Sequence, residues 1–338
     1  MKVLFVVSGN NKHYEVAPFI QSQGESLRAA GVELDYFGIK GKGLKYLNNV
    51  GRLRRLLREN HYDVIHAHYS FCGWIPLLTG TRRPIVLSLM GDDATGTFAG
   101  VNKITFKSRV LMFLAWAIQP FMDAIISKSP NIESFVYLKK KSHLVPNGVR
   151  LEQFSLFDRK TLREKLGMSP DKKYVLFLGN KADPNKNYAL AADAVATLNR
   201  PDVELINPFR ITHDQVVEYL NAADVFVLCS FSEGSPNVVK EAMACNCPAV
   251  VTDVGDAAWV VSETEGCHVG SFEPADFAQK IALSLQYASE KGRTKGRERL
   301  LELGLDAESI AHKIIDIYKS LLKTNKQTQP TLQSEQVS

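Results

Sequence analysis

The strongest constraint on the fold is a regular alternation of short apolar runs with longer amphipathic or polar segments. In the first 150 residues the apolar runs are 3–7, 32–39, 64–68, 85–90, 124–127 and 144–146. Most of the segments between them are long enough to form helices. Near-continuous apolar strands separated by helices are typical of a parallel sheet that is covered on both faces.

The alternation pauses in a charged stretch between residues 150 and 173 and then restarts. The second series has apolar runs at 174–178, 203–206, 225–229 and 249–252, and helical segments at 188–198, 213–222, 236–245 and 274–287. We therefore predict two doubly wound α/β domains, 1–150 and 173–305, joined by a linker at 151–172. Residues 306–323 are expected to form a last amphipathic helix. Residues 324–338 lack an apolar period and are expected to be a disordered tail.

The net charge of +5 is the sum of two halves of opposite sign. Residues 1–150 contain 20 Lys and Arg against 10 Asp and Glu, a net +10, whereas residues 151–338 contain 21 against 26, a net −5. A hydrophobic content of 45% with 23% charged residues is ordinary for globular domains. This composition excludes a disordered chain and a collagen-like fibre.

The sequence also predicts the compartment. Five cysteines without regular spacing argue against a disulfide framework and favour a reducing cytoplasm. The apolar run that begins at Val3 is too short for a signal peptide, and the longest apolar run, 110–118, is too short to span a bilayer. We expect a cytoplasmic protein without a transmembrane segment.

The loops at the carboxyl ends of the predicted strands are the expected ligand site, because open parallel sheets bind ligands there. The most informative loop carries Glu233 and leads into a helix that contains Glu241. Ser235 is a predicted N-cap and Pro236 a predicted first helical residue. The amides of Asn237 and Val238 then suit a phosphate or an oxyanion. The carboxylates either bind sugar hydroxyls or are a solvated loop acid and a solvated helix acid.

This stretch resembles the donor-site motif of glycosyltransferase family 4, because the two glutamates stand with Gly234, Pro236, Asn237 and Ala242 around them. Further segments resemble that family in the same order along the chain, at 63–68, 145–149, 178–181, 186–187 and 248–255. The resemblance covers residues 1–320.

The resemblance implies a GT-B fold, in which two Rossmann-like domains face each other across a cleft and the last helix crosses back to the first domain. It implies a retaining, metal-independent hexosyltransferase without a cofactor. The nucleoside-diphosphate sugar is a co-substrate, and the acceptor is a glycan or a lipid-linked molecule of surface polysaccharide biosynthesis. By position Glu241 holds the ribose, Glu233 contacts the donor sugar, and Lys186 neutralises the leaving diphosphate.

The sequence departs from the family at two places. Asn180 replaces the usual Arg after the first glycine of the second domain. Either one cation is missing from the site, or Lys181 or Arg210 replaces it; the alternative for Arg210 is an ordinary surface residue. Met90 stands where a His is frequent, and His68 or Asp92 is the expected replacement. Gly9 is expected either to approach the donor or to make a tight turn. Asn147 and Asp92 are expected on the acceptor side.

No metal site is predicted. His66 and His68 alternate on a strand and so share a face, but they lack a third ligand. Cys245 and Cys247 lack a second pair. A nicotinamide dehydrogenase is disfavoured because no glycine-rich dinucleotide fingerprint follows the first strand.

Residues 40–58 contain seven Lys and Arg with interleaved leucines, the pattern of a basic amphipathic helix that binds an anionic membrane surface. Lys103, Lys107 and Arg109 precede the apolar run 110–118 in the same half. The alternatives are a solvated helix face and a buried core helix. Nucleic acid is not expected, because no recognition motif accompanies the charge. We therefore expect a peripheral protein on the inner face of the cytoplasmic membrane.

Two other functions compete with this interpretation. A non-catalytic GT-B partner subunit is motivated by Asn180 and Met90, and it predicts nucleotide binding without turnover. A secreted two-domain sugar-binding protein would require a signal peptide.

Overall fold

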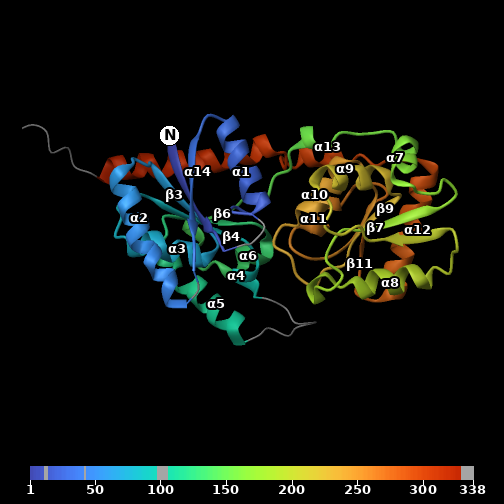
Figure 1. The fold of residues 1–338 in the computed structure, drawn as a ribbon, viewed down its shortest axis with the longest axis horizontal. Coiled ribbons are helices and arrows are strands. Elements are labelled where there is room, and N and C mark those ends of the chain that lie inside the picture. The colour runs from blue at the N-terminus through green and yellow to red at the C-terminus, as the bar shows by residue number, and fades with distance from the viewer. Residues whose placement is uncertain (11–13, 42, 97–105, 329–338) are drawn as a thin grey trace, which may run out of the picture.

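The structure is a computed structural model, and it describes residues 1–10, 14–41, 43–96 and 106–328. The chain forms two α/β domains side by side (Figure 1). Each is built on one parallel sheet, so the predicted pair of parallel α/β domains, the architecture of the expected GT-B fold, is confirmed.

The N-terminal domain has a six-stranded sheet in the order β2-β1-β3-β4-β5-β6. Its strands are β1 Lys2–Ser8, β2 Glu33–Ile39, β3 Val64–His68, β4 Ile85–Leu89, β5 Ala124–Ser127 and β6 Ser142–Leu144. Its helices are α1 Pro18–Ala29, η1 Gly43–Leu47, α2 Asn48–Glu59, α3 Ser70–Leu78, α4 Asp92–Thr95, α5 Phe106–Ala117, η2 Gln119–Phe121, α6 Pro130–Phe135 and η3 Lys139–Lys141. Every residue of β3, β4 and β5 is buried, which explains their continuous apolar runs.

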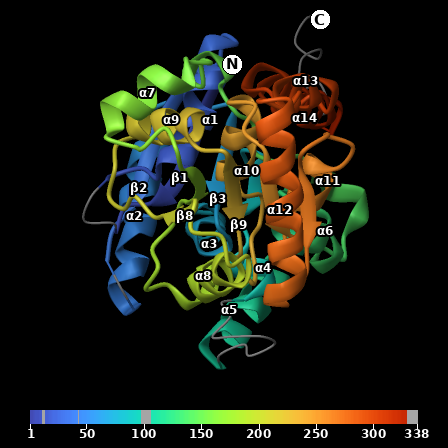
Figure 2. The same ribbon diagram turned by 90° about the vertical axis from the view of Figure 1, so that its right-hand side faces the viewer.

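The C-terminal domain has a five-stranded sheet in the order β11-β10-β9-β7-β8. Its strands are β7 Lys173–Phe177, β8 Val203–Ile206, β9 Val225–Leu228, β10 Ala249–Thr252 and β11 His268–Gly270. The helices from residue 151 onward are η4 Leu151–Gln153, α7 Arg159–Leu166, η5 Pro184–Lys186, α8 Tyr188–Thr197, α9 His213–Ala222, α10 Asn237–Ala244, α11 Ala257–Val261, α12 Pro274–Glu290, α13 Gly296–Glu302 and α14 Ala307–Thr328. The end-on view shows α13 and α14 along one edge of the molecule and α5 at the opposite edge (Figure 2).

The structure differs from the sequence-based expectation in several segments, including the unpredicted helices α11 and α13. Strand β11 was not predicted, because its three residues are too short to give a period. The segment expected as a linker contains α7, whose Arg163 lies 2.6 Å from the buried carboxylate of Asp224 and thereby joins the helix to the C-terminal domain. The expected disordered tail is wrong over its first residues, since α14 continues to Thr328. The rest of that tail, 329–338, lies outside the described residues.

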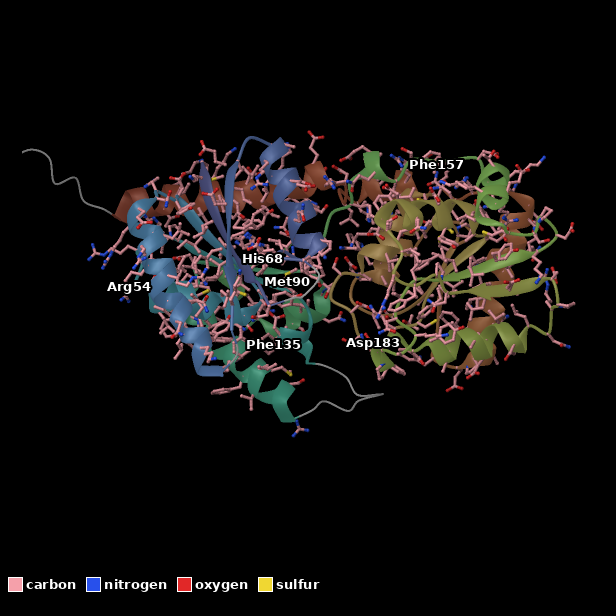
Figure 3. The ribbon with its side chains drawn as sticks, in the orientation of Figure 1. Arg54, His68, Met90, Phe135, Phe157 and Asp183 are labelled. Carbon is pink, nitrogen blue, oxygen red and sulfur yellow. The ribbon has the colours of Figure 1, made fainter. Side chains whose placement is uncertain are left out.

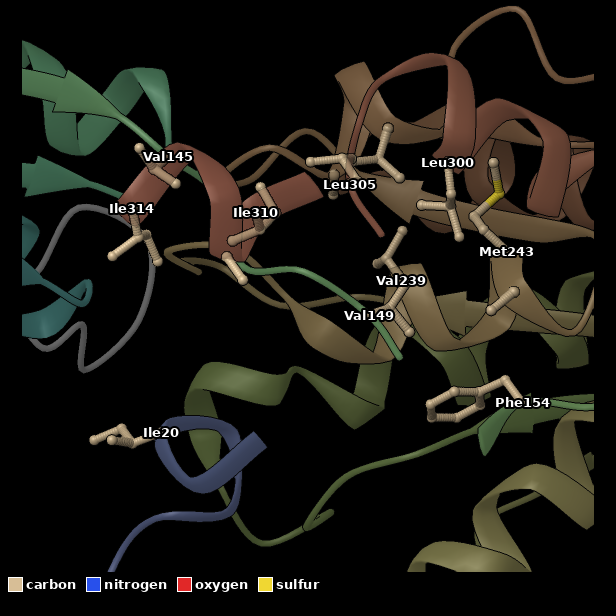
Figure 4. Packing of buried hydrophobic residues seen from close by; sticks show 14 of the residues in the cluster. Ile20, Val145, Val149, Phe154, Val239, Met243, Leu300, Leu305, Ile310 and Ile314 are labelled. Carbon is tan, nitrogen blue, oxygen red and sulfur yellow. The ribbon is translucent and has the colours of Figure 1, made fainter. Parts of the chain in front are cut away.

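The two domains share one apolar core at the point where the chain crosses between them. Val145 and Val149 from the end of the N-terminal domain pack in one cluster with Val239, Leu305 and Ile310 (Figure 4). The Val149 amide donates to the Leu305 carbonyl at 2.9 Å, and the Ala307 amide donates back to the Val149 carbonyl at 2.9 Å. The outgoing and returning segments are therefore fixed to each other.

Helix α14 then crosses the N-terminal domain and packs against α1 (Figure 1). Its Tyr318 is fully buried, and the hydroxyl lies 2.5 Å from Nδ1 of His66 on β3. Over the described part of the chain, no helix combines the length and the apolar character needed to cross a bilayer.

Candidate functional site

The loops that follow β7 and β9 are joined through Asn185. Its carbonyl accepts from the Phe231 amide at 2.9 Å, and its side-chain amide donates to the Ser232 carbonyl at 2.9 Å. The turn is closed by Asp183, whose carboxylate accepts from the Asn185 amide at 3.0 Å. In Figure 3 Asp183 lies on the side of the C-terminal domain that faces Met90 of the other domain.

This arrangement places Lys186 against Glu233. The ammonium lies 2.6 Å from Oε1 of the carboxylate, and both side chains are partly exposed. A flexible cation paired at an open surface can exchange its partner for an anionic ligand, because the charge of the lysine is not committed to a buried site. The structure thus brings together two residues that the sequence places 47 positions apart.

Gly234, which follows Glu233, is wedged between two backbone segments. A Cβ there would lie 2.3 Å from the Met90 carbonyl oxygen, at the end of β4. On the other side, a Cβ at Gly255 would lie 2.5 Å from the Gly234 carbonyl oxygen, and Gly255 has a φ of +61°. Only glycine lets these three segments meet, so the Glu233 loop is in backbone contact with the N-terminal domain.

Ser235 does not act as the predicted N-cap. Helix α10 begins at Asn237, and the capping position is Pro236, which has no side-chain cap. The Ser235 hydroxyl instead donates to Asp256 at 2.8 Å and accepts from the Lys240 ammonium at 2.5 Å. It also accepts from the Asn147 backbone amide at 3.1 Å, while the Asn147 side chain donates to the Ser235 carbonyl at 3.2 Å.

Ser235, expected on the donor side, and Asn147, expected on the acceptor side, thus bind each other across the domain boundary. We name Asn147, Ser235, Lys240 and Asp256 the interdomain clamp. Its Lys240–Asp256 ion pair, at 2.8 Å, is fully buried.

Lys128 at the end of β5 is a second buried lysine near the clamp. Burial, reinforced by the positive charge of Lys240, lowers its pKa to about 7. Its ammonium lies 3.4 Å from the side-chain oxygen of Gln23 on α1. Sequence reasoning missed Lys128, Lys240 and Asp256, because lysines are almost never fully buried and no pattern marks the exceptions.

Glu241 faces a cavity of about 410 Å³ between the two domains. The cavity is also lined by Asn237, by His213 at the start of α9, and by the paired side chains of Glu25 and Arg150, which are 2.5 Å apart. Glu241 is partly buried, and this burial raises the pKa of its carboxyl to about 7. A carboxyl poised near neutrality can accept or donate hydrogen bonds to hydroxyl groups. Val238, beside it on α10, is partly buried.

His68 was expected in the cleft, but its side chain does not reach it. Its ring is fully buried and stacks on His66, with centroids 4.3 Å apart, as the alternation on β3 predicts. In the described part of the chain neither ring nitrogen has a hydrogen-bond partner, and burial holds the pKa of His68 well below its usual range. The neutral ring makes His68 a core residue in this conformation.

Asp93, which was not expected in the site, organises the loop after β4. Its carboxylate accepts from the amides of Ser70, Met90 and Gly91 at 2.8, 2.9 and 3.1 Å. The neighbouring Asp92 begins α4, and its side chain lies outside the described part of the structure.

The remaining residues predicted at the donor lie in different structural environments. Gly9 donates to the Ile39 carbonyl at 2.9 Å, and a Cβ there would lie 3.2 Å from the backbone of Gly38, so close packing accounts for this glycine. Asn180 and Lys181 are exposed in the turn after β7. Arg210 is exposed, and its guanidinium lies 5.5 Å from the ring centroid of Phe209. None of the contacts found for the described residues joins these side chains to the Lys186–Glu233 pair.

Comparison with known proteins gives matches to both halves of the chain. Residues 9–153 match the family described as Glycosyltransferase Family 4, and residues 201–286 match Glycosyl transferases group 1. A Bacillus subtilis protein named for teichuronic acid biosynthesis, the glycosyltransferase TuaC, is 25% identical over 59% of this chain and 55% of its own length. The match thus spans little more than half of that relative.

Solved structures share the fold over nearly the whole chain. Sucrose-phosphate synthase of Thermosynechococcus elongatus has a TM-score of 0.79 and 19% identity, covering 96% of this chain and 99% of that one. The Anabaena protein HepE in complex with UDP has a TM-score of 0.73 and 16% identity, covering 95% and 100%.

Proposed function

We propose that the chain transfers a sugar from a nucleoside-diphosphate sugar to an acceptor, because its two halves match Glycosyltransferase Family 4 and Glycosyl transferases group 1. The observation that carries this proposal is the placement of Lys186 and Glu233, 2.6 Å apart, on the loops that face the N-terminal domain. The Glu241 cavity lies between the same two domains. A cation, a carboxylate and a hydroxyl-binding cavity at one domain boundary suit a charged, hydroxyl-rich donor.

The donor is proposed to lie along α10. Glu241 holds the ribose hydroxyls, the first amides of α10 face the phosphates, and Glu233 contacts the donor sugar. Cleavage of the donor leaves negative charge on the diphosphate, and Lys186 stabilises that charge as it develops. The complex of HepE with UDP supports a nucleoside diphosphate as the ligand class. In our proposal the reaction retains the anomeric configuration and uses no metal or cofactor, as the family resemblance implies.

The acceptor is proposed to bind the N-terminal domain. A cavity of about 370 Å³ there is lined by the aromatic rings of Tyr14, Tyr46, Tyr69 and Phe71. Aromatic faces pack well against the apolar faces of sugar rings, which favours a glycan or a lipid-linked glycan. The name of TuaC supports a role in surface polysaccharide biosynthesis. We propose that the protein works on the inner face of the cytoplasmic membrane.

The test combines binding with turnover. Thermal-shift measurements with uridine, guanosine and other nucleoside diphosphates identify the base, since a bound ligand raises the midpoint by mass action. Transfer is then measured with the matching sugar nucleotides and with glycan and lipid-linked acceptors. Lys186→Ala is expected to lower kcat roughly 10²–10³-fold, the usual loss when a preorganised stabiliser of developing charge is removed.

Lys165→Ala is the matched control, because Lys165 makes an exposed 2.6 Å ion pair with Glu218 away from the site. It is expected to leave kcat within about twofold, as surface pairs contribute little. Undiminished turnover in both Lys186→Ala and Glu241→Ala would refute the site. Nucleotide binding without turnover for any acceptor would favour the non-catalytic partner subunit, for which Asn180 and Met90 are the motivation.

A further inference from the structure

Helix α5 and the segments beside it expose a cluster of large apolar side chains. Phe113 is 63% exposed, Trp116 46%, Phe121 56% and Tyr137 41%. The ring of Trp116 lies 6.3 Å from that of Phe113 and 4.8 Å from that of Tyr137. We name these four residues the aromatic patch. Phe113, Trp116 and Tyr137 form a contiguous exposed apolar surface, which marks an interaction site rather than ordinary surface variation.

The patch is held in place by the fold. Gln119 of η2 accepts from the Tyr137 amide at 3.1 Å, and the Lys141 ammonium donates to the carbonyls of Pro120 and Met122 at 3.0 and 2.7 Å. Ala115 and Ile118 face the opposite way and are fully buried. The aromatic rings are therefore exposed on a firmly anchored element.

Positive charge borders the patch. Arg109 on α5, and Lys139 and Lys140 on η3, are exposed. The acids nearby have partners: Glu133 pairs with Lys139 at 3.6 Å and accepts from the Ser142 hydroxyl at 2.6 Å, and Asp123 accepts from the Ile85 amide at 2.7 Å. The patch thus combines exposed rings with a basic border in the half of the chain that carries +10.

Helix α2, which the sequence predicts as the membrane-binding element, lacks the exposed apolar side chains of the aromatic patch. Its Leu53 and Leu57 are buried in the core, so its apolar side is already used. Arg54, at the outer end of the N-terminal domain in Figure 3, donates to the carbonyls of Leu78 and Thr79. This helix offers positive charge to a surface but few side chains that could insert.

We propose that the aromatic patch docks on an anionic lipid bilayer. The rings of Phe113, Trp116, Phe121 and Tyr137 enter the interface, where aromatic side chains are favoured, and Arg109 and Lys140 bind lipid phosphates. Leu111, on another side of the same helix, lines the aromatic cavity assigned to the acceptor. The proposal rests on the membrane association proposed above, and it assigns that association to one surface. The head of a lipid-linked acceptor then reaches the cavity around α5.

The test is flotation of the full chain with vesicles of phosphatidylglycerol and phosphatidylcholine, at low and high salt. The wild type is expected to float with anionic vesicles at low salt and to bind less at high salt, because the attraction is electrostatic. The double variant F113S/W116S is expected to lose at least tenfold in apparent affinity. The control F209S/W259S removes two exposed aromatic residues of the C-terminal domain, 50% and 43% exposed, and is expected to bind as the wild type does.

Equal flotation of F113S/W116S and the wild type would overturn the proposal. If only R55Q/R58Q, on α2, abolished flotation, the assigned surface would be wrong while membrane association stood. Dimerisation in analytical ultracentrifugation that F113S/W116S abolished, without an effect on lipid binding, would assign the patch to a second copy of the chain. The thermal shift caused by nucleoside diphosphate is expected to be unchanged in F113S/W116S. That shift shows that the variant is folded, and it separates this test from that of the donor site.

Discussion

Ser235→Ala tests whether the interdomain clamp stabilises the fold. Ser235 is 7% exposed, and its hydroxyl makes hydrogen bonds with three partners. Removing the hydroxyl deletes the hydrogen bonds to the Asp256 carboxylate and from the Lys240 ammonium, and leaves the Asn147 amide without its acceptor. The Lys240–Asp256 pair, 2.8 Å apart, remains in the variant.

The size of the effect follows from the loss of these contacts. A hydrogen bond to a charged group contributes about 1.5–3 kcal/mol, and a buried donor left without a partner costs about 1–3 kcal/mol. The two terms share one atom and are not fully additive. We therefore expect Ser235→Ala to lower the free energy of unfolding by about 3 kcal/mol.

Urea unfolding at pH 7, followed by circular dichroism, measures this loss. Ser134→Ala is the control, because that exposed hydroxyl donates to a backbone carbonyl of its own helix at 2.6 Å; it should change the free energy of unfolding by less than about 0.5 kcal/mol. A loss below about 1 kcal/mol for Ser235→Ala would refute the reasoning. Such a result would mean that water replaces the hydroxyl and that the clamp contributes no net stability.

Two further predictions concern residues around the cavity and the loop contact. The folded-state pKa of Glu241, about 7, is above its ordinary value of 4.5, so its contribution to stability is present below pH 4.5 and is lost as pH rises through 7. Glu241→Gln should therefore raise the melting temperature relative to the wild type at pH 8 and leave it unchanged at pH 4; an equal shift at both values would contradict the raised pKa. Gly234→Ala places a Cβ 2.3 Å from the Met90 carbonyl and should destabilise by about 1–3 kcal/mol, whereas Gly51→Ala, in the open middle of α2, should stabilise by about 0.5–1 kcal/mol. The urea midpoints of the two glycine variants measure these changes in stability. A Gly234→Ala protein that is more stable than the wild type would exclude the predicted clash.

The parallel sheets could be predicted from sequence because burial on both faces leaves a continuous apolar run. Strand β3 was predicted at its observed bounds for this reason, whereas the three residues of β11 left too little pattern. The loops of Glu233 and Lys186 were also predictable, since strand ends and glycine, proline and asparagine mark them locally.

The parts of the site that sequence reasoning missed depend on contacts between distant segments. Asn147 and Ser235 are 88 residues apart, and nothing in either neighbourhood indicates that they bind each other. His68 was expected at the cleft because it ends a strand, but the side of the sheet that it faces is covered by other residues. Burial of Lys240 likewise follows from the packing of α10 against the rest of the domain and has no local signal.

The path of α14 has a consequence for how the protein is made. His66 and Tyr318 are hydrogen-bonded although 252 positions separate them, so the first domain is completed by the last helix. At a translation rate of about 5–20 residues per second, roughly 8–34 s pass between synthesis of residue 150 and of Tyr318. During that interval the surface that α14 later covers is exposed on the nascent chain. The order of synthesis thus leaves the N-terminal domain unfinished until α14 has been made.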